Sequence, residues 1–225
     1  ATKGAEQYCY GIIDQDNVKR RKFYEVQSFF KEMKDNEALT QSEVKSDVAV
    51  VYDYESMASF RIQRQSFLMD YKQEVYRLYR PFYKKNINMD VIPSDSDFDK
   101  YKVLLLPVMI VHKKEVQDKV RKFVSGGGTV VFTYRTAVKD YYNNLTLGQF
   151  NPTYYTDLVG GYVEEVESFQ DDQVALLIGN EEFEGINGTA TVFRDMLKTT
   201  TAKTLFKYED EFFEDLAAVT LNEYE

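Results

Sequence analysis

The sequence predicts an α/β fold built on a doubly wound, mostly parallel β-sheet. Two apolar runs of strand length, at 102–110 and 129–134, are separated by a charged amphipathic stretch at 113–124. The triple glycine at 126–128 follows that stretch, where one glycine supplies a left-handed helix cap and the others allow a close return to the sheet. A strand, a crossover helix and a second strand in this order indicate parallel pairing with a right-handed connection.

The first ninety residues predict an amphipathic helix, a linker and an earlier strand–helix–strand unit. The expected elements are a helix at 18–34, a polar linker at 35–46, a strand at 48–52, a long helix at 61–85 and a strand at 88–92. Both helices are predicted from apolar residues spaced three and four apart, and Pro81 suggests a kink or an early end of the second helix. With the later unit added, the sheet resembles flavodoxin in outline.

The sequence after residue 134 predicts a loop followed by short strands. The loop spans 135–160 and mixes polar with aromatic residues. The expected strands lie at 162–166, 174–178, 189–193, 204–208 and 217–221, with a helical turn at 195–198.

Composition restricts the partners and the location of the protein. A formal net charge of −9 on 225 residues repels phosphate groups, so neither nucleic acid nor an anionic membrane is an expected partner. The longest apolar run, Val103 to Val111, is far shorter than the ~20 residues that span a bilayer. The amino terminus resembles no signal peptide and does not begin with Met, so we expect a processed chain or a piece of a longer one. An acidic chain with one cysteine fits the cytoplasm.

Neither a metal nor a cofactor is expected. Cys9 is the only cysteine and His112 the only histidine, which excludes an internal disulfide and a cysteine-based zinc site. His112 opens a predicted helix among charged residues, and we interpret it as a solvated histidine rather than a general base.

The predicted carboxyl ends of the strands show no obvious reactive group. Chemistry in open parallel sheets is usually placed there, and a nucleophile would need a Ser or Cys on a sharp turn between small residues. The third strand ends LLLPVMIVH, so we expect no such elbow and no catalytic residue. Asp53 and Arg135 end the first and fourth strands, and we interpret them as ion-pair or interface residues. The acidic turns GNEEFEG and YEDEFFED are interpreted as solvated faces.

Aromatic residues are abundant, with 18 Tyr and 16 Phe but no Trp. Rigid rings bury much area at low entropic cost, so they favour packed surfaces inside a domain or between subunits. The loop at 135–160 concentrates Asp140 with Tyr141, Tyr142, Tyr154 and Tyr155. We interpret these residues as interface or structural candidates, and a core role for the tyrosines stays open.

Two stretches resemble glycoside hydrolase family 42 β-galactosidases. GAEQYCYGIIDQDNVKRRKFYEVQSFF, at 4–30, is similar to the last strand and helix of the catalytic barrel. VAVVYDYESMASF, VLLLPVMIV, FVSGGGTVVFTYRTAVKD and FKYEDEFFEDLAAVTLNEYE resemble the trimerisation domain that follows the barrel. The most specific motif is GGGTVVFTYRTAVKD. The resemblance implies a barrel fragment at 1–40 and a trimerisation domain at 41–225.

The resemblance also implies a function. The trimerisation domain has a fold like that of class I glutamine amidotransferases without their chemistry, and it would assemble a homotrimer. Both catalytic carboxylates of the family lie upstream in the barrel, so the chain alone is expected to be inactive, with galactoside bound only by the full-length parent. Glu6 matches a sugar-binding Glu, whereas Cys9 occupies the family's His position, and a thiol is a poor substitute for an imidazole donor.

Two other functions stay open at the level of the sequence. One is a stand-alone amidotransferase-like hydrolase that uses acidic residues such as Asp53. The other is a carbohydrate-binding module whose exposed tyrosines stack on sugar rings. The absence of Trp disfavours the second.

Overall fold

The computed structural model describes residues 11–224 and divides the chain into two compact units, 1–45 and 46–225. The first unit contains α1 (Arg21–Asp35) and the single-turn α2 (Glu37–Thr40). The predicted helix at 18–34 is confirmed with a later start, while the predicted linker contains α2. No side chain of α1 is buried, and its apolar residues Phe29 and Phe30 are exposed.

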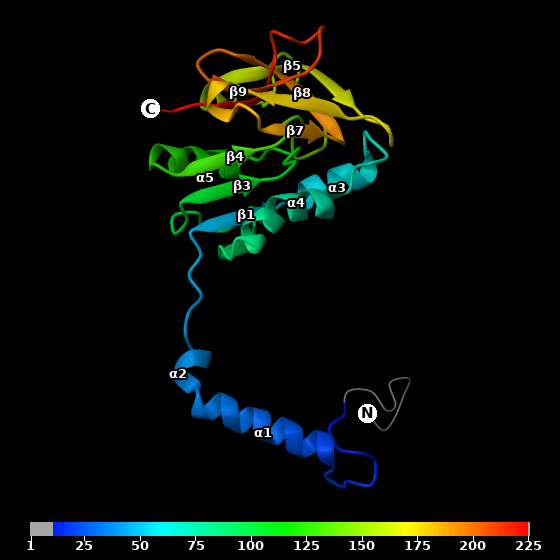
Figure 1. Ribbon diagram of the computed structural model, residues 1–225, viewed down its shortest axis with the longest axis vertical. Helices are drawn as coiled ribbons and strands as arrows, with labels where there is room; N and C mark the ends of the chain where they lie inside the picture. The colour runs from blue at the N-terminus through cyan, green and yellow to red at the C-terminus, as the bar shows by residue number, and fades with distance from the viewer. Residues whose placement is uncertain (1–10, 225) are drawn as a thin grey trace. The chain divides into compact units, whose positions relative to one another are not determined.

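The second unit is built around a parallel sheet of four strands (Figure 1). These are β1 (Val48–Tyr52), β2 (Met89–Pro93), β3 (Val103–Leu106) and β4 (Thr129–Phe132), in the order β2-β1-β3-β4. Every pair in this sheet is parallel, as the crossover argument predicts. The prediction of a parallel α/β sheet is therefore confirmed for the first half of this unit.

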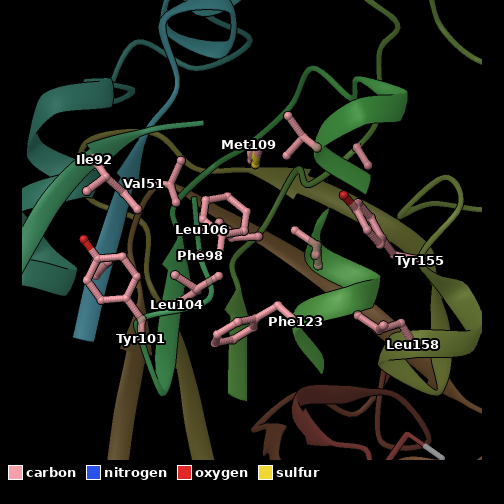
Figure 2. Close-up of a cluster of buried hydrophobic side chains, with 14 residues drawn as sticks. Val51, Ile92, Phe98, Tyr101, Leu104, Leu106, Met109, Phe123, Tyr155 and Leu158 are labelled. Carbon is pink, nitrogen blue, oxygen red and sulfur yellow. The ribbon is translucent and has the colours of Figure 1, made fainter. Parts of the chain in front are cut away.

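Both faces of the parallel sheet are buried at its two central strands, β1 and β3. Alternate residues of β1 enter different clusters, Ala49 and Val51 on one face and Val48 and Val50 on the other. Figure 2 shows the first cluster, where Val51 and Leu106 lie with residues of later segments such as Tyr155. Burial on both faces explains why β1 and β3 read as continuous apolar runs.

Helices and tight turns connect the parallel strands. After β3 the chain forms α5 (Lys114–Ser125), which is capped by Gly126 and followed by Gly127 at φ +91°. At Gly128 a Cβ would lie 2.3 Å from the Phe123 ring, so the chain passes too close to this helix for any side chain. The two roles expected of the triple glycine are confirmed at Gly127 and Gly128.

The predicted helix at 61–85 is wrong as a single element. The structure has α3 (Tyr54–Ile62) and α4 (Tyr71–Lys84), separated by a non-helical segment at 63–70. Asp70 begins α4 by accepting hydrogen bonds from the main-chain N–H groups of Lys72 and Gln73. Pro81 lies inside α4 and does not end it.

The rest of the chain forms an antiparallel sheet of six strands, so the expectation of one mostly parallel sheet is wrong for this half. Its strands are β5 (Gly161–Ser168), β6 (Ala175–Gly179), β7 (Asn187–Ala190), β8 (Phe193–Thr199), β9 (Lys203–Tyr208) and β10 (Ala217–Leu221). The order is β5-β8-β10-β9-β6-β7, and the short helix η1 (Glu181–Phe183) joins β6 to β7.

Two local predictions fail in the second half. The helical turn expected at 195–198 is part of β8, and the strand expected at 189–193 is divided between β7 and β8. Four consecutive residues of β8, from Phe193 to Met196, are buried, so this strand lacks the alternation that identifies a half-buried strand. The loop predicted at 135–160 is irregular apart from the single turn α6 (Thr156–Val159).

Candidate functional site at the carboxyl edge of the parallel sheet

The turn after β3 bends sharply at Val108, which has φ +39°. Positive φ is an outlier for a β-branched residue, and such backbone costs about 1–3 kcal/mol. The Val108 N–H donates to Thr133 Oγ1 at 2.7 Å, and the Val108 side chain is fully buried. The sharp turn at the end of β3 therefore carries an apolar side chain that lies in the core, where a nucleophile elbow would carry a reactive side chain.

Asp53 lies at the end of β1 as the N-terminal cap of α3. Its carboxylate accepts hydrogen bonds from the Ser56 N–H at 2.9 Å and from Ser94 Oγ at 2.7 Å. The ammonium group of Lys113 lies 3.6 Å from Asp53 Oδ1 and 3.0 Å from Glu55 Oε2. Asp53 is 1% exposed, so its oxygens are occupied by the protein and closed to a substrate.

The charge of Lys113 is maintained by these two carboxylates. Partial burial lowers the pKa of Lys113, but the hydrogen bond with Glu55 and the charge of Asp53 outweigh it, and the pKa is raised overall. Lys113 is therefore a protonated ion-pair partner in this corner of the sheet.

Arg135 occupies a different place from Asp53. Its guanidinium group donates to Gln65 Oε1 from Nε at 3.0 Å and from Nη2 at 2.6 Å, and it lies over the Phe193 ring. The Arg135 N–H donates to Asp195 Oδ2 at 2.7 Å. Arg135 thus joins the connection after β4 to the segment between α3 and α4 and to β8, whereas the cation beside Asp53 is Lys113.

Sequence reasoning missed Lys139, which is only 2% exposed at this edge. Its ammonium group lies 3.4 Å from Ser59 Oγ and 3.3 Å from Gln63 Oε1. Burial lowers the pKa of Lys139, and the nearby charge of Arg135 lowers it further. Charge patterning gives no signal for this position, because a lysine in a polar loop reads as solvated.

The loop at 140–150, called the aromatic loop here, is anchored by polar contacts. Asp140 Oδ1 accepts from the N–H groups of Tyr142 and Asn144, both at 2.9 Å. Ser59 Oγ of α3 donates to Asn143 Oδ1 at 2.6 Å. The hydrogen bonds that Asp140 accepts lower its pKa, chiefly the one from the Asn144 N–H.

His112 also supports the aromatic loop, and the expectation that it is a solvated residue is wrong. Its Nε2 lies 3.0 Å from Thr146 Oγ1, its Nδ1 lies 3.1 Å from Gln117 Nε2, and its ring meets the edge of Tyr154. Burial lowers the pKa of His112. Both ring nitrogens have partners, so the imidazole is a structural group.

The aromatic loop exposes large apolar side chains although it is held in place. Tyr142 is 80% exposed and Leu147 is 87% exposed, and Tyr141, Leu145 and Phe150 are exposed beside them. Tyr155, in contrast, is buried against Phe132 in the core that Figure 2 shows. A fixed loop with several exposed apolar side chains is typical of a protein–protein contact surface.

Glu6 and Cys9 lie outside the described residues. Between residues 11 and 224, no three acidic, histidine or cysteine side chains gather as a group that could hold a metal ion. Among the helices described, none has the length and apolar character needed to cross a membrane.

Packed side chains close this edge of the sheet, and the exposed apolar residues of the aromatic loop beside it favour a contact role over catalysis. The comparison with known families agrees. The model of the β-galactosidase trimerisation domain matches residues 46–225. The chain belongs to this family, which is part of glycoside hydrolase family 42 β-galactosidases.

Relatives and solved structures support this assignment. A β-galactosidase of Clostridium cellulovorans is 31% identical over 98% of this chain and 33% of its own length, and one of Geobacillus is 27% identical over 98% and 32%. The crystal structure of a Bacillus circulans β-galactosidase has a TM-score of 0.87 at 25% identity, covering 100% of this chain and 34% of that one. A Halorubrum lacusprofundi β-galactosidase has a TM-score of 0.73 at 26% identity, covering 99% and 32%. The chain therefore spans about a third of the length of each of these four proteins.

Proposed function

We propose that this chain is the subunit-assembly part of a family 42 β-galactosidase and that its α/β domain organises a homotrimer. The observation that carries the proposal is the aromatic loop, whose apolar side chains are exposed although Asp140, His112 and Ser59 hold the loop in place. An ordered apolar surface loses little entropy on association, so it favours binding.

We also propose a finer class for the fold of the parallel sheet. The order β2-β1-β3-β4 and the bend at Val108 support a flavodoxin-like or amidotransferase-like sheet. We assign residues 1–40 to the end of a catalytic barrel and 41–225 to the trimerisation domain. The exposed apolar residues of α1 support this division, because the outer helices of a barrel bury one face against its strands.

Substrate would be bound only by the full-length parent, in the cytoplasm. There Glu6 would contact the galactosyl unit, and Cys9 would supply a weaker contact than an imidazole. Within this chain Asp53 is buried as the N-terminal cap of α3, and the Val108 side chain after β3 is buried and apolar, so neither supports hydrolysis.

Sedimentation velocity of the purified chain tests the proposal. We expect a trimer, and we expect the double substitution Tyr142→Ala and Leu147→Ala to shift it toward monomer. Tyr83→Ala, which removes an exposed ring from α4, is the matched control and should leave the trimer intact. A chain that stays monomeric at high concentration would contradict the proposal.

Two assays test the alternatives. Turnover of a nitrophenyl galactoside or of glutamine above background would favour the hydrolase. Heat released on titration with galactose or lactose would favour the carbohydrate-binding module.

A further inference from the structure

The segment between α3 and α4 forms a cavity of about 260 Å³, called the α3–α4 cavity here. Phe60, Met57 and Met69 supply apolar walls, and Phe60 and Met69 are themselves buried. A cavity of ~150 Å³ is enough for a benzene ring. The α3–α4 cavity can therefore admit an aromatic side chain.

Three cations line this cavity, which is unusual for a chain of net charge −9. Arg61, Arg64 and Lys72 are exposed, and none of their side chains has an ion pair or hydrogen bond with any residue from 11 to 224. Asp70 is the one acidic residue in the lining, and its Oδ1 is engaged in capping α4. The lining thus favours an occupant that is both apolar and anionic.

Exposed apolar residues extend the surface around the cavity. Phe67 is 97% exposed and Ile62 is 75% exposed. The aromatic loop contacts the same helix, because Ser59 Oγ of α3 donates a hydrogen bond to Asn143 Oδ1. The cavity and the aromatic loop therefore both lie against α3.

The turn between β9 and β10 has the complementary character. Phe212 is 92% exposed there, and Glu211, Glu214 and Asp215, which are also exposed, lie beside it in the sequence. Within the described part of the chain, these three side chains have no ion pair. This acidic turn lies in YEDEFFED, one of the two segments whose composition predicts a solvated face.

Phe212 projects from a turn that is anchored by Asp210. Asp210 Oδ1 accepts from the Phe212 N–H at 3.0 Å, while Asp210 Oδ2 lies 2.9 Å from Arg194 Nη1. The Arg194 guanidinium lies over the Phe213 ring, which packs against a buried cluster. The hydrogen bond from Phe212 and the charge of Arg194 lower the pKa of Asp210. Asp210 therefore stays ionised at neutral pH and keeps the contacts that anchor this turn.

We propose that Phe212 of one copy of this chain enters the α3–α4 cavity of a second copy. Glu211, Glu214 and Asp215 then face Arg61, Arg64 and Lys72 across the contact. In Figure 1 the β9–β10 connection, in orange-red, lies away from α3, so a copy does not fill its own cavity. The inference rests on the proposed function, because a ring of three copies requires two different patches that fit each other.

Charge reversal in the full chain tests this contact, with sedimentation velocity as the readout. The double variant Arg61→Glu, Arg64→Glu should raise the dissociation constant of the trimer at least tenfold, and so should Phe212→Ala. Arg80→Glu reverses an exposed cation of α4 outside the cavity and should change nothing. Combining Arg61→Glu and Arg64→Glu with Glu211→Lys and Glu214→Lys should restore assembly, because the two patches are then exchanged in sign.

The outcomes separate this inference from the proposed function. A trimer in wild type that is unaffected by these variants would overturn the inference and leave the assembly function intact. A wild type that stays monomeric would contradict both. If the charge-reversal variants dissociate and the fourfold variant does not restore the trimer, the proposed contact is wrong. If inorganic phosphate binds to the cavity and assembly is unchanged, the cations bind another anion and the proposed contact is also wrong. Circular dichroism should show equal folding for every variant, since the substituted side chains are exposed.

Discussion

The main-chain N–H of Arg135 donates to the carboxylate of Asp195 at 2.7 Å, joining the connection after β4 to β8 of the antiparallel sheet. Asp195 is buried, and its second oxygen, Oδ1, has no hydrogen-bond partner among the residues described. Burial raises the pKa of Asp195 to about 6, against the opposing effects of the Arg135 N–H and charge. The two sheets of this domain are thus joined at a carboxyl group that is costly to ionise.

Asp195 should make folding stability depend on pH. An unfolded aspartate ionises near pH 4, so between pH 4 and 6 the folded chain holds a proton that the unfolded chain has lost. The contribution of Asp195 to the free energy of unfolding is fully present below pH 4 and is lost as the pH rises through 6. The loss is about 3 kcal/mol at most. Asp195→Asn cannot ionise and should become more stable relative to wild type as pH rises.

Urea unfolding at pH 4, 5, 6 and 7 measures this difference. Asp171→Asn removes an exposed carboxylate and serves as the control, with a free-energy difference from wild type that stays nearly constant. A difference between wild type and Asp195→Asn that is equally constant would contradict the pKa of Asp195.

Gly128 should tolerate no side chain. A Cβ would lie 2.3 Å from the Phe123 ring, which is buried in the core. We expect Gly128→Ala to reduce the free energy of unfolding by about 1–3 kcal/mol through overpacking. Gly126→Ala is the matched control in the same turn, because a Cβ there meets only main-chain oxygens, the nearer at 3.3 Å. Equal losses for the two variants would show that the Phe123 ring moves aside.

The parallel sheet could be predicted from the sequence because the patterns that indicate its strands and turns are local. β1 and β3 are buried on both faces and read as VAVVY and VLLL, while the triple glycine ends α5. The break between α3 and α4 was missed because Phe67, Leu68 and Tyr71 keep helical spacing. That break depends on distant contacts, such as the bond from Ser66 Oγ to the carbonyl of Phe169.

The composition of the sequence predicted the aromatic loop, but it did not predict which tyrosines are exposed and which are buried. The loop was recognised by its tyrosines, yet Tyr142 is exposed and Tyr155 lies in the core. Which of them is buried depends on packing against Phe132 of β4. The α3–α4 cavity gave no signal either, because it exists only where the predicted helix is broken.

The bend after β3 should be closed to reagents. Val108→Cys places a thiol at the elbow position, but the side chain there is fully buried. In a Cys9→Ser background we expect its reaction with a disulfide reagent to be slowed on the order of 100-fold or more, since the chain must first open. Val174→Cys in the same background is the exposed control and should react freely. Rapid modification at position 108 would reveal an accessible site and revive the hydrolase interpretation.

Asp53 should act through structure rather than chemistry. Asp53→Ala removes the cap of α3 and leaves the Ser56 N–H and the Ser94 hydroxyl without their acceptor, so we expect a loss of about 1–3 kcal/mol in the free energy of unfolding. Asp53→Asn keeps an acceptor oxygen and should lose less, because Lys113 retains Glu55 as an ion-pair partner. Urea unfolding gives the ranking, and glutamine or galactoside turnover measured on the same three proteins should stay at background. A wild-type turnover that Asp53→Asn abolishes at unchanged stability would make this carboxylate catalytic and contradict its role as a helix cap.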